Sequence, residues 1–284
     1  MGDIETEGAM PERKRGFFMK KKLAAVLAAV LCLSVAAGCG SDKEDLAYIQ
    51  DKGEMIMGIT LFEPMNYYDE NGKLVGFETE FATAVCEKLG VEPKFQVIDW
   101  KQKEVELKAK AIDCIWNGLT VDEERKEDMA FSTAYVRNRQ VAIIRKADVQ
   151  KYTTAESMAG AKMTAENGSA GQTAIENDAV LSKNPYTGVS AQKDALLEVK
   201  AGASDVAVLD YIMAKAVING ETDYADLMIV EDIQLTPEEY AVGFRLEDKE
   251  LLAEVNKIID ELVADGTMAK LAEKYDLAEN LAFQ

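Results

Sequence analysis

Residues 54–98 read EMIMGITLFEPMNYYDENGKLVGFETEFATAVCEKLGVEPKFQVI, and this stretch decides the fold. It begins and ends with short apolar segments, residues 54–60 and 94–98, which have the length and composition of buried strands. Between them, residues 77–90 carry apolar side chains at helical spacing, and Gly90 is suited to end a helix. A strand, a helix and a strand in this order predict a βαβ unit with parallel strands. The helical stripe consists of Phe77, Phe81, Val85 and Leu89.

The rest of the chain continues this alternation. An Asn-Gly pair within residues 69–74 predicts a hairpin turn between two apolar stretches, and a second helical stripe runs through residues 251–262. Alternating strands and helices predict an α/β protein with a largely parallel sheet. The remaining predicted strands span residues 113–116, 140–145, 161–166, 205–209 and 227–230.

The N-terminus carries a targeting pattern. Three lysines at positions 20–22 precede an apolar run at residues 23–38, as in a signal peptide. The run has 16 residues, fewer than the roughly 20 that a helix needs to span a bilayer. Residues 1–18 read as an extension or an upstream start and are left out of the fold reasoning. The apolar run is either cleaved off or retained as a membrane anchor. In both cases the folded part of the chain is expected outside the cytoplasm.

The apolar run ends in AAGC at residues 36–39, which resembles a bacterial lipobox, although Ala36 stands where Leu is more usual. The resemblance implies that residues 1–39 hold the extension and a lipoprotein signal peptide, and that Cys39 carries acyl chains such as palmitate. Residues 40–45 then form a polar tether. The expected location is extracytoplasmic, on the outer face of the cell membrane.

The charge excludes several classes of function. The formal net charge of −19 disfavours nucleic acid as a partner, because phosphate binding needs clustered Lys and Arg, and no such cluster follows Lys22. The chain has no His, which excludes a His-dependent triad or zinc site. Without residues 1–39 the chain would hold 26 basic and 47 acidic residues, so attachment to a membrane would depend on acyl chains and not on a basic patch.

Two cysteines, Cys86 and Cys114, follow the targeting segment. Each lies in an apolar segment, which favours buried free thiols. A disulfide between them is the alternative in an oxidising compartment.

Three loops that follow predicted strands carry groups able to hold the ends of a zwitterion. In the first, residues 113–126 (DCIWNGLTVDEERK), Thr120 and Arg125 follow Asn117-Gly118 where a helix is expected to begin. Free N–H groups at a helix N-terminus and the planar fork of Arg both suit a carboxylate. An ordinary turn with a solvated Arg is the alternative.

The other two loops lie further along the chain. Residues 165–175 (AENGSAGQTAI) hold small residues that let backbone amides approach an anion at another expected helix start. Asp210 stands at the carboxyl end of the apolar strand 205–209, where open α/β sheets place ligands. A helix N-cap is the alternative role for Asp210.

Taken together, these motifs closely resemble the polar amino acid family of extracytoplasmic solute-binding proteins of ABC importers. The resemblance spans residues 46–278, and NGLT followed by ERK is its most specific part. It implies a type II periplasmic-binding-protein fold: two α/β lobes, each a mixed sheet flanked by helices, joined by two hinge strands. The expected first lobe comprises residues 46–138 and 241–284, and the second comprises 139–240. The motifs are residues 58–85, 113–136, 166–171, 205–210 and 239–244.

The resemblance also implies roles for individual residues. Arg125, Thr120 and the amides around Ser169 and Ala170 would bind the α-carboxylate of an amino acid. The Gly118 carbonyl and Asp210 would bind its α-ammonium group. Phe62 would stack on the ligand, and the candidates for the side-chain pocket are Trp100, Asn117 and Glu166. For Trp100 and Glu166, a core or surface role is the alternative. Strand alternation turns Trp116 toward the core and gives Asn117 the cleft face.

One departure bears on specificity. Family members that bind basic or polar ligands often carry an acid near the position of Ile59, and this sequence does not. Glu166 could compensate, which would favour a Lys, Arg, ornithine or amide side chain over Glu or Asp, because like charges in a desolvated cleft are costly.

We therefore expect a monomeric binding protein that delivers an amino acid to the permease subunits of an ABC importer, without cofactor, metal or catalytic residues. One alternative is an enzyme on the same fold, such as a dehydratase of cyclic carboxylic acids, for which Glu166 would be the nearest thing to a general acid or base. The other alternative is an amino-acid sensor.

Overall fold

The computed structural model describes residues 44–233 and 235–283. The predicted extension and signal peptide (residues 1–39), the predicted lipidation site Cys39 and the start of the predicted tether lie outside these residues. Within them, no helix has both the length and the apolar character needed to cross a membrane.

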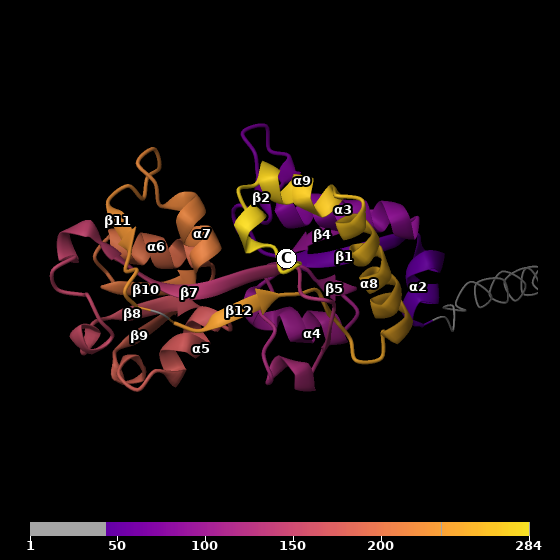
Figure 1. Cartoon of the computed structure of the whole chain (residues 1–284). Helices are drawn as coiled ribbons and strands as arrows, with labels where there is room; N and C mark the ends of the chain where they lie inside the picture. Colours follow the sequence, from indigo (N-terminus) through magenta and orange to yellow (C-terminus); the bar gives the residue numbers. More distant parts are fainter. Residues whose placement is uncertain (1–43, 234, 284) are drawn as a thin grey trace, which may run out of the picture. The chain divides into compact units, whose positions relative to one another are not determined.

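The first lobe is built on a five-stranded sheet in the order β4-β1-β5-β13-β6, of which Figure 1 labels β4, β1 and β5. Strands β1, β4 and β5 are parallel, and β13 pairs with both β5 and β6 in the antiparallel sense. The βαβ unit predicted from residues 54–98 is confirmed. The strands are β1 (Glu54–Ile59), β4 (Glu92–Val97), β5 (Cys114–Ile115), β6 (Ala130–Phe131) and β13 (Gly243–Phe244).

Helices cover the first sheet with the apolar faces that the sequence predicts. Helix α3 ends at Gly90, which adopts the left-handed conformation with φ of 74° that glycine tolerates best. Helix α8 buries the second predicted stripe in the same core. The helices are α2 (Asp45–Lys52), α3 (Phe77–Leu89), α4 (Lys103–Lys108), α8 (Lys249–Ala264) and α9 (Thr267–Lys274).

The second lobe is built on a separate sheet with the order β11-β7-β10-β8-β9. Strands β10, β8 and β9 are parallel, whereas β7 is antiparallel to both β10 and β11. Both large sheets are therefore mixed, as the fold class predicts. The strands are β7 (Val136–Arg145), β8 (Met163–Glu166), β9 (Tyr186–Val189), β10 (Val206–Asp210) and β11 (Leu227–Ile229), and the helices are α5 (Ala170–Asn177), α6 (Gln192–Lys200) and α7 (Tyr211–Val217).

Two paired strands join the lobes: β7 and β12 (Pro237–Tyr240), which run side by side in Figure 1. The first residue of β7, Val136, also bridges to Leu281 of the first lobe, and Tyr240 bridges to Thr120. The expected lobe boundaries, after residues 138 and 240, fall on these strands and stay a prediction at that precision.

Two smaller predictions are also settled. The hairpin at residues 69–74 is confirmed as β2 (Tyr67–Tyr68) and β3 (Leu74–Val75), with Gly72 at φ of 75°. Cys86 and Cys114 are buried free thiols, so the alternative of a disulfide between them is wrong. Burial raises the pKa of Cys86 to about 12, so the thiol is neutral and unreactive at ordinary pH.

Candidate functional site

A small polar cavity lies where the two lobes face each other. Nine of the ten residues predicted to contact a ligand line it, and Gln192 is the one further lining residue. The first lobe contributes Trp100, Asn117, Gly118, Thr120 and Arg125, and the second contributes Glu166, Ser169, Ala170, Gln192 and Asp210.

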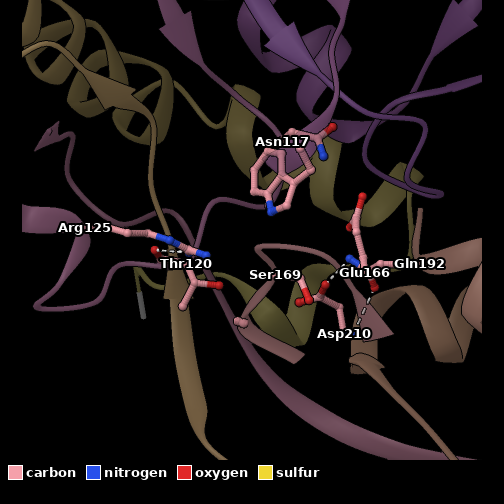
Figure 2. A pocket seen from close by; sticks show the side chains of 10 residues that line it. Asn117, Thr120, Arg125, Glu166, Ser169, Gln192 and Asp210 are labelled. Atoms are coloured by element: carbon pink, nitrogen blue, oxygen red, sulfur yellow. Dashed lines mark hydrogen bonds between the residues drawn. The ribbon is translucent and has the colours of Figure 1, made fainter. Parts of the chain in front are cut away.

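The positions of these residues follow from the two sheets. Asn117 lies two residues after the end of β5, Glu166 ends β8 and Asp210 ends β10. The carboxyl ends of parallel strands are where open α/β sheets leave a crevice for ligands. In Figure 2, Arg125 lies on one side of the cavity, whereas Glu166, Gln192 and Asp210 lie together on the other. The cavity thus has a cationic side and an acidic side.

Arg125 is held as a rigid fork on the cationic side. It is only 9% exposed, and its Nη1 donates to the Thr120 carbonyl oxygen at 2.9 Å. Its Nε lies 3.2 Å from a carboxylate oxygen of Asp122. The prediction that a helix begins here is wrong, because the chain forms only a short 3-10 turn, Arg125–Glu127. This loop therefore offers an anion the guanidinium group and no N-terminus of an α-helix.

The second loop does begin a helix, as predicted. Ser169 caps α5, and its hydroxyl oxygen accepts a hydrogen bond from the Gln172 backbone N–H at 3.2 Å. Ala170 is the first helical residue, so the free N–H groups of the first turn lie at the cavity wall. A helix N-terminus favours negative charge, which adds to the effect of Arg125.

Asp210 stands at the N-cap position of α7 but does not cap it. Its Oδ1 instead accepts hydrogen bonds from Asn138 Nδ2 at 2.6 Å, from Gln140 Nε2 at 2.9 Å and from the Tyr240 hydroxyl at 2.5 Å. Gln192 donates to the other oxygen, Oδ2. Asp210 thus occupies the N-cap position of the alternative, but its carboxylate makes no capping bond and is fixed by four donors in the cavity wall.

Glu166 presents the opposite situation. Its side chain is 3% exposed, and its Oε1 is buried without a hydrogen-bond partner among the described residues. Burial, followed by the negative charge of Asp210, raises the pKa of Glu166 to about 8, while Lys103 opposes the shift. The carboxyl group is therefore mostly protonated at neutral pH.

Glu78 lies behind the site and holds Gly118 in place. This role was not predicted from the sequence. Its two carboxylate oxygens accept hydrogen bonds from the Gly118 backbone N–H at 2.8 and 3.0 Å, and one also accepts from Tyr135. Burial raises the pKa of Glu78 to about 7, against the effect of these donors. The bonds fix the Gly118 peptide group at the cavity. In the sequence Glu78 reads as an ordinary polar residue in the first turn of a helix.

Phe62 is the predicted ligand contact that does not line the cavity. It is buried behind Gly118 and packs edge-on against Tyr240, with ring centroids 6.4 Å apart. Asn117 lies at the cavity wall, but its amide nitrogen donates to the Thr60 hydroxyl at 2.7 Å. Trp116 packs in the core, as strand alternation predicts.

The described part of the chain holds no group of three or more His, Cys, Asp or Glu side chains that could bind a metal ion. The chemistry of the site therefore comes from one guanidinium group, backbone amides and carboxyl groups. This arrangement can hold a small molecule that carries both a carboxylate and a cation.

Two mixed α/β lobes with a polar cavity between them define a type II periplasmic-binding-protein fold, and solved structures agree. An ABC uptake transporter substrate binding protein from Streptococcus pneumoniae with bound histidine is 31% identical, with a TM-score of 0.74, over 83% of this chain and 96% of that one. AncCDT-1, an ancestral amino acid-binding protein and a precursor of cyclohexadienyl dehydratase, is 26% identical, with a TM-score of 0.73, over 81% of this chain and 98% of that one.

Residues 55–278 match the model of the bacterial extracellular solute-binding proteins, family 3, and the chain belongs to this family. Among individual relatives, the L-cystine-binding protein TcyJ of Escherichia coli (strain K12) is 26% identical over 258 residues, which cover 90% of this chain and 95% of that protein. The predicted family resemblance is confirmed.

Proposed function

We propose that this protein is a lipid-anchored extracytoplasmic substrate-binding protein that captures an amino acid between its lobes and delivers it to an ABC importer. The observation that carries the proposal is the polarity of the buried cavity, with Arg125 on one side and Asp210 on the other (Figure 2). An α-amino acid presents a carboxylate and an ammonium group at a fixed short separation. It therefore complements both sides at once.

The α-carboxylate binds the Arg125 fork and the free amides around Ser169 and Ala170, and the Thr120 hydroxyl joins them by turning from Glu238, to which it donates in this structure. A guanidinium group in a desolvated site forms strong, directional bonds with a carboxylate. The ammonium group binds Asp210 and the Gly118 carbonyl oxygen. The space for the ligand side chain is then enclosed by Trp100, Asn117 and Gln192. The stacking role expected of Phe62 stays a prediction without a cavity contact in its support.

Capture works by closure of the lobes. Arg125 and Gly118 belong to the first lobe, while Ser169 and Asp210 belong to the second, so only a closed arrangement lets one ligand contact all four. A ligand stabilises the state in which it makes more contacts. The paired strands β7 and β12 are suited to act as the hinge, and closure would signal occupancy to the permease subunits.

The lipid anchor at Cys39 is supported by the lipobox-like AAGC and by membership of a family of extracellular proteins. Metabolic labelling with palmitate tests it. Label should enter the wild-type chain and not Cys39→Ser, and equal labelling of both would disprove an anchor at this cysteine.

A thermal-shift screen of residues 40–284 tests amino-acid capture, after bound ligand is removed by unfolding and refolding. The twenty amino acids, ornithine, citrulline and cystine are the ligands. At about 100 times Kd a ligand adds roughly 2.7 kcal/mol of stability, which raises Tm by several degrees. A selective shift that disappears in Arg125→Ala supports the proposal. No shift with any ligand would disprove it.

The second candidate is an enzyme that dehydrates a cyclic carboxylic acid. It is favoured by one observation, the unpartnered Glu166 carboxyl group in the cavity, whose pKa of about 8 suits a general acid. Turnover of a cyclohexadienyl carboxylic acid by the purified protein, followed by chromatography of the products, would establish it, and the absence of turnover would disprove it.

A further inference from the structure

We propose that Glu166 determines the specificity of this cavity: it selects an amino acid with a cationic side chain, and its carboxyl proton is released when that ligand binds. The inference rests on the proposed function and names the substrate class. The exchange is balanced, because the O–H bond of Glu166 breaks, the proton passes to the solvent, and the ligand cation takes its place as the partner of the carboxylate.

The ionisable groups of the cavity are unequally matched by an amino acid. Among the ten lining residues, the side chains that can carry charge are Arg125, Glu166 and Asp210. The α-carboxylate of a ligand matches Arg125, and its α-ammonium group matches Asp210. Glu166 is then the carboxyl group of the lining that has no charged partner. A cationic side chain on the ligand supplies that partner once the proton has left, whereas an acidic side chain would bring a second carboxyl group beside Glu166 in a desolvated space.

The two acidic groups of the cavity differ in hydrogen bonding. Asp210 accepts four side-chain hydrogen bonds, so its charge is already stabilised by the protein. Glu166 Oε1 is buried and has no partner within the described residues. An unpaired buried acceptor is costly, and a donor supplied by the ligand removes that cost. The ligand therefore gains more from a cation at Glu166 than from a second contact with Asp210.

The neighbouring charges do not satisfy Glu166. Asp210, Asp194 and Asp99 all raise its pKa, and Lys103 alone among the contributing neighbours lowers it. The Lys103 ammonium group lies 2.9 Å from a carboxylate oxygen of Glu104 and donates to the Gly168 carbonyl oxygen at 3.2 Å. It is thus engaged with other partners. Arg125 lies on the far side of the cavity (Figure 2).

These surroundings predict a pH dependence of affinity. With a pKa of about 8, Glu166 holds its proton at pH 6 to 7 in the unliganded protein, and a cation must displace it. The affinity for arginine or lysine should rise by up to about tenfold per pH unit below pH 8 and level off above it. A ligand with a neutral side chain displaces no proton at Glu166, so its affinity should not rise with pH in this way.

Isothermal titration calorimetry of the unliganded protein tests the proposal with arginine and lysine against citrulline, norleucine and glutamate. At pH 7, titrations in buffers of different ionisation enthalpy should show release of nearly one proton with arginine and none with citrulline. Glu166→Gln should weaken arginine binding by tenfold or more, abolish proton release and retain citrulline binding. Glu176→Gln removes one exposed charge from α5 and controls for the overall charge of the protein.

The outcomes separate the two proposals. If no amino acid binds, the proposed function itself fails. If arginine and citrulline bind wild-type protein equally well and without proton release, amino-acid capture stands and the role of Glu166 is disproved. Should Glu166→Gln fail to fold, the comparison of arginine with citrulline in wild-type protein between pH 6 and 8.5 decides the same question.

Discussion

The Nη2 atom of Arg125 in the first lobe donates a hydrogen bond to the carbonyl oxygen of Gly168 in the second lobe, over 3.2 Å. Lys103 Nζ donates to the same oxygen, also at 3.2 Å. The Gly168 carbonyl oxygen of the second lobe thus accepts hydrogen bonds from two cationic side chains of the first lobe. Because these contacts cross between the lobes, they exist only when the cavity is closed, and they lie beside the anion-binding side of the cavity.

Replacement of Lys103 by Met should shift the protein toward the open form. Lys103 is 2% exposed, and its ammonium group also lies 4.9 Å from the centre of the Trp100 ring. Loss of one charge-assisted bond costs about 1.5–3 kcal/mol, or roughly 10- to 150-fold in the closing equilibrium. Small-angle X-ray scattering should show a larger radius of gyration at subsaturating ligand. The exposed Lys101→Met is the control, and equal radii for both variants would refute a role in closure.

Arg125→Lys tests whether the planar fork matters beyond its charge. Lys keeps the positive charge but cannot hold the Thr120 carbonyl, the Gly168 carbonyl and a ligand carboxylate together. We expect Kd to rise at least tenfold in Arg125→Lys and at least a hundredfold in Arg125→Ala, because a buried charge pair loses its partner. Calorimetry measures both. A change below tenfold in Arg125→Ala would contradict the assigned role.

Much of the site could be predicted because three of its segments directly follow apolar strands. Glu166 and Asp210 end β8 and β10, and Asn117 lies two residues after β5, so a correct order of strands brings them together. The error at Arg125 has a local cause. The acidic and basic residues that follow Thr120 are typical of a first helical turn, and Asp122 accepts a hydrogen bond from the Arg125 backbone N–H as an N-cap does, but the chain makes only one short turn before β6 begins at Ala130.

The parts of the site that could not be predicted depend on contacts distant in the sequence. β12 reads PEEY, a polar segment without the apolar alternation of a strand, yet it buries Glu238 beside β7. Glu238 accepts hydrogen bonds from Thr120, Asn138 and Gln140, all at least 98 residues away. No local pattern indicates such a network. Gln192 was missed for the same reason, because its partner Asp210 lies on another element.

A methyl group added at Gly118 should disturb both fold and binding. Gly118 has φ of 53°, and a Cβ there would lie 2.5 Å from the Phe62 ring. We expect Gly118→Ala to destabilise the protein by more than 1 kcal/mol and to weaken ligand binding. Gly90→Ala is a matched control, because Gly90 also has a positive φ of 74° but open space around its Cβ position. Urea unfolding compares the two, and equal losses would show that strain in the backbone alone is responsible.

The unliganded protein should become less stable as pH rises from about 5 to above 8. Glu78 and Glu166 have pKa values raised to about 7 and about 8, mainly by burial, and burial also raises the pKa of Glu238. A raised pKa means that the folded state binds more protons than the unfolded state over this interval, so deprotonation favours unfolding. The stability contributed by each protonated group is fully present below its unfolded pKa and is lost as pH passes the folded value. Thermal unfolding at pH 5, 6, 7 and 8.5 should give a falling Tm, with a smaller fall between pH 7 and 8.5 in Glu166→Gln than in Glu176→Gln. A flat profile in wild-type protein would mean that these carboxyl groups are already ionised at pH 5.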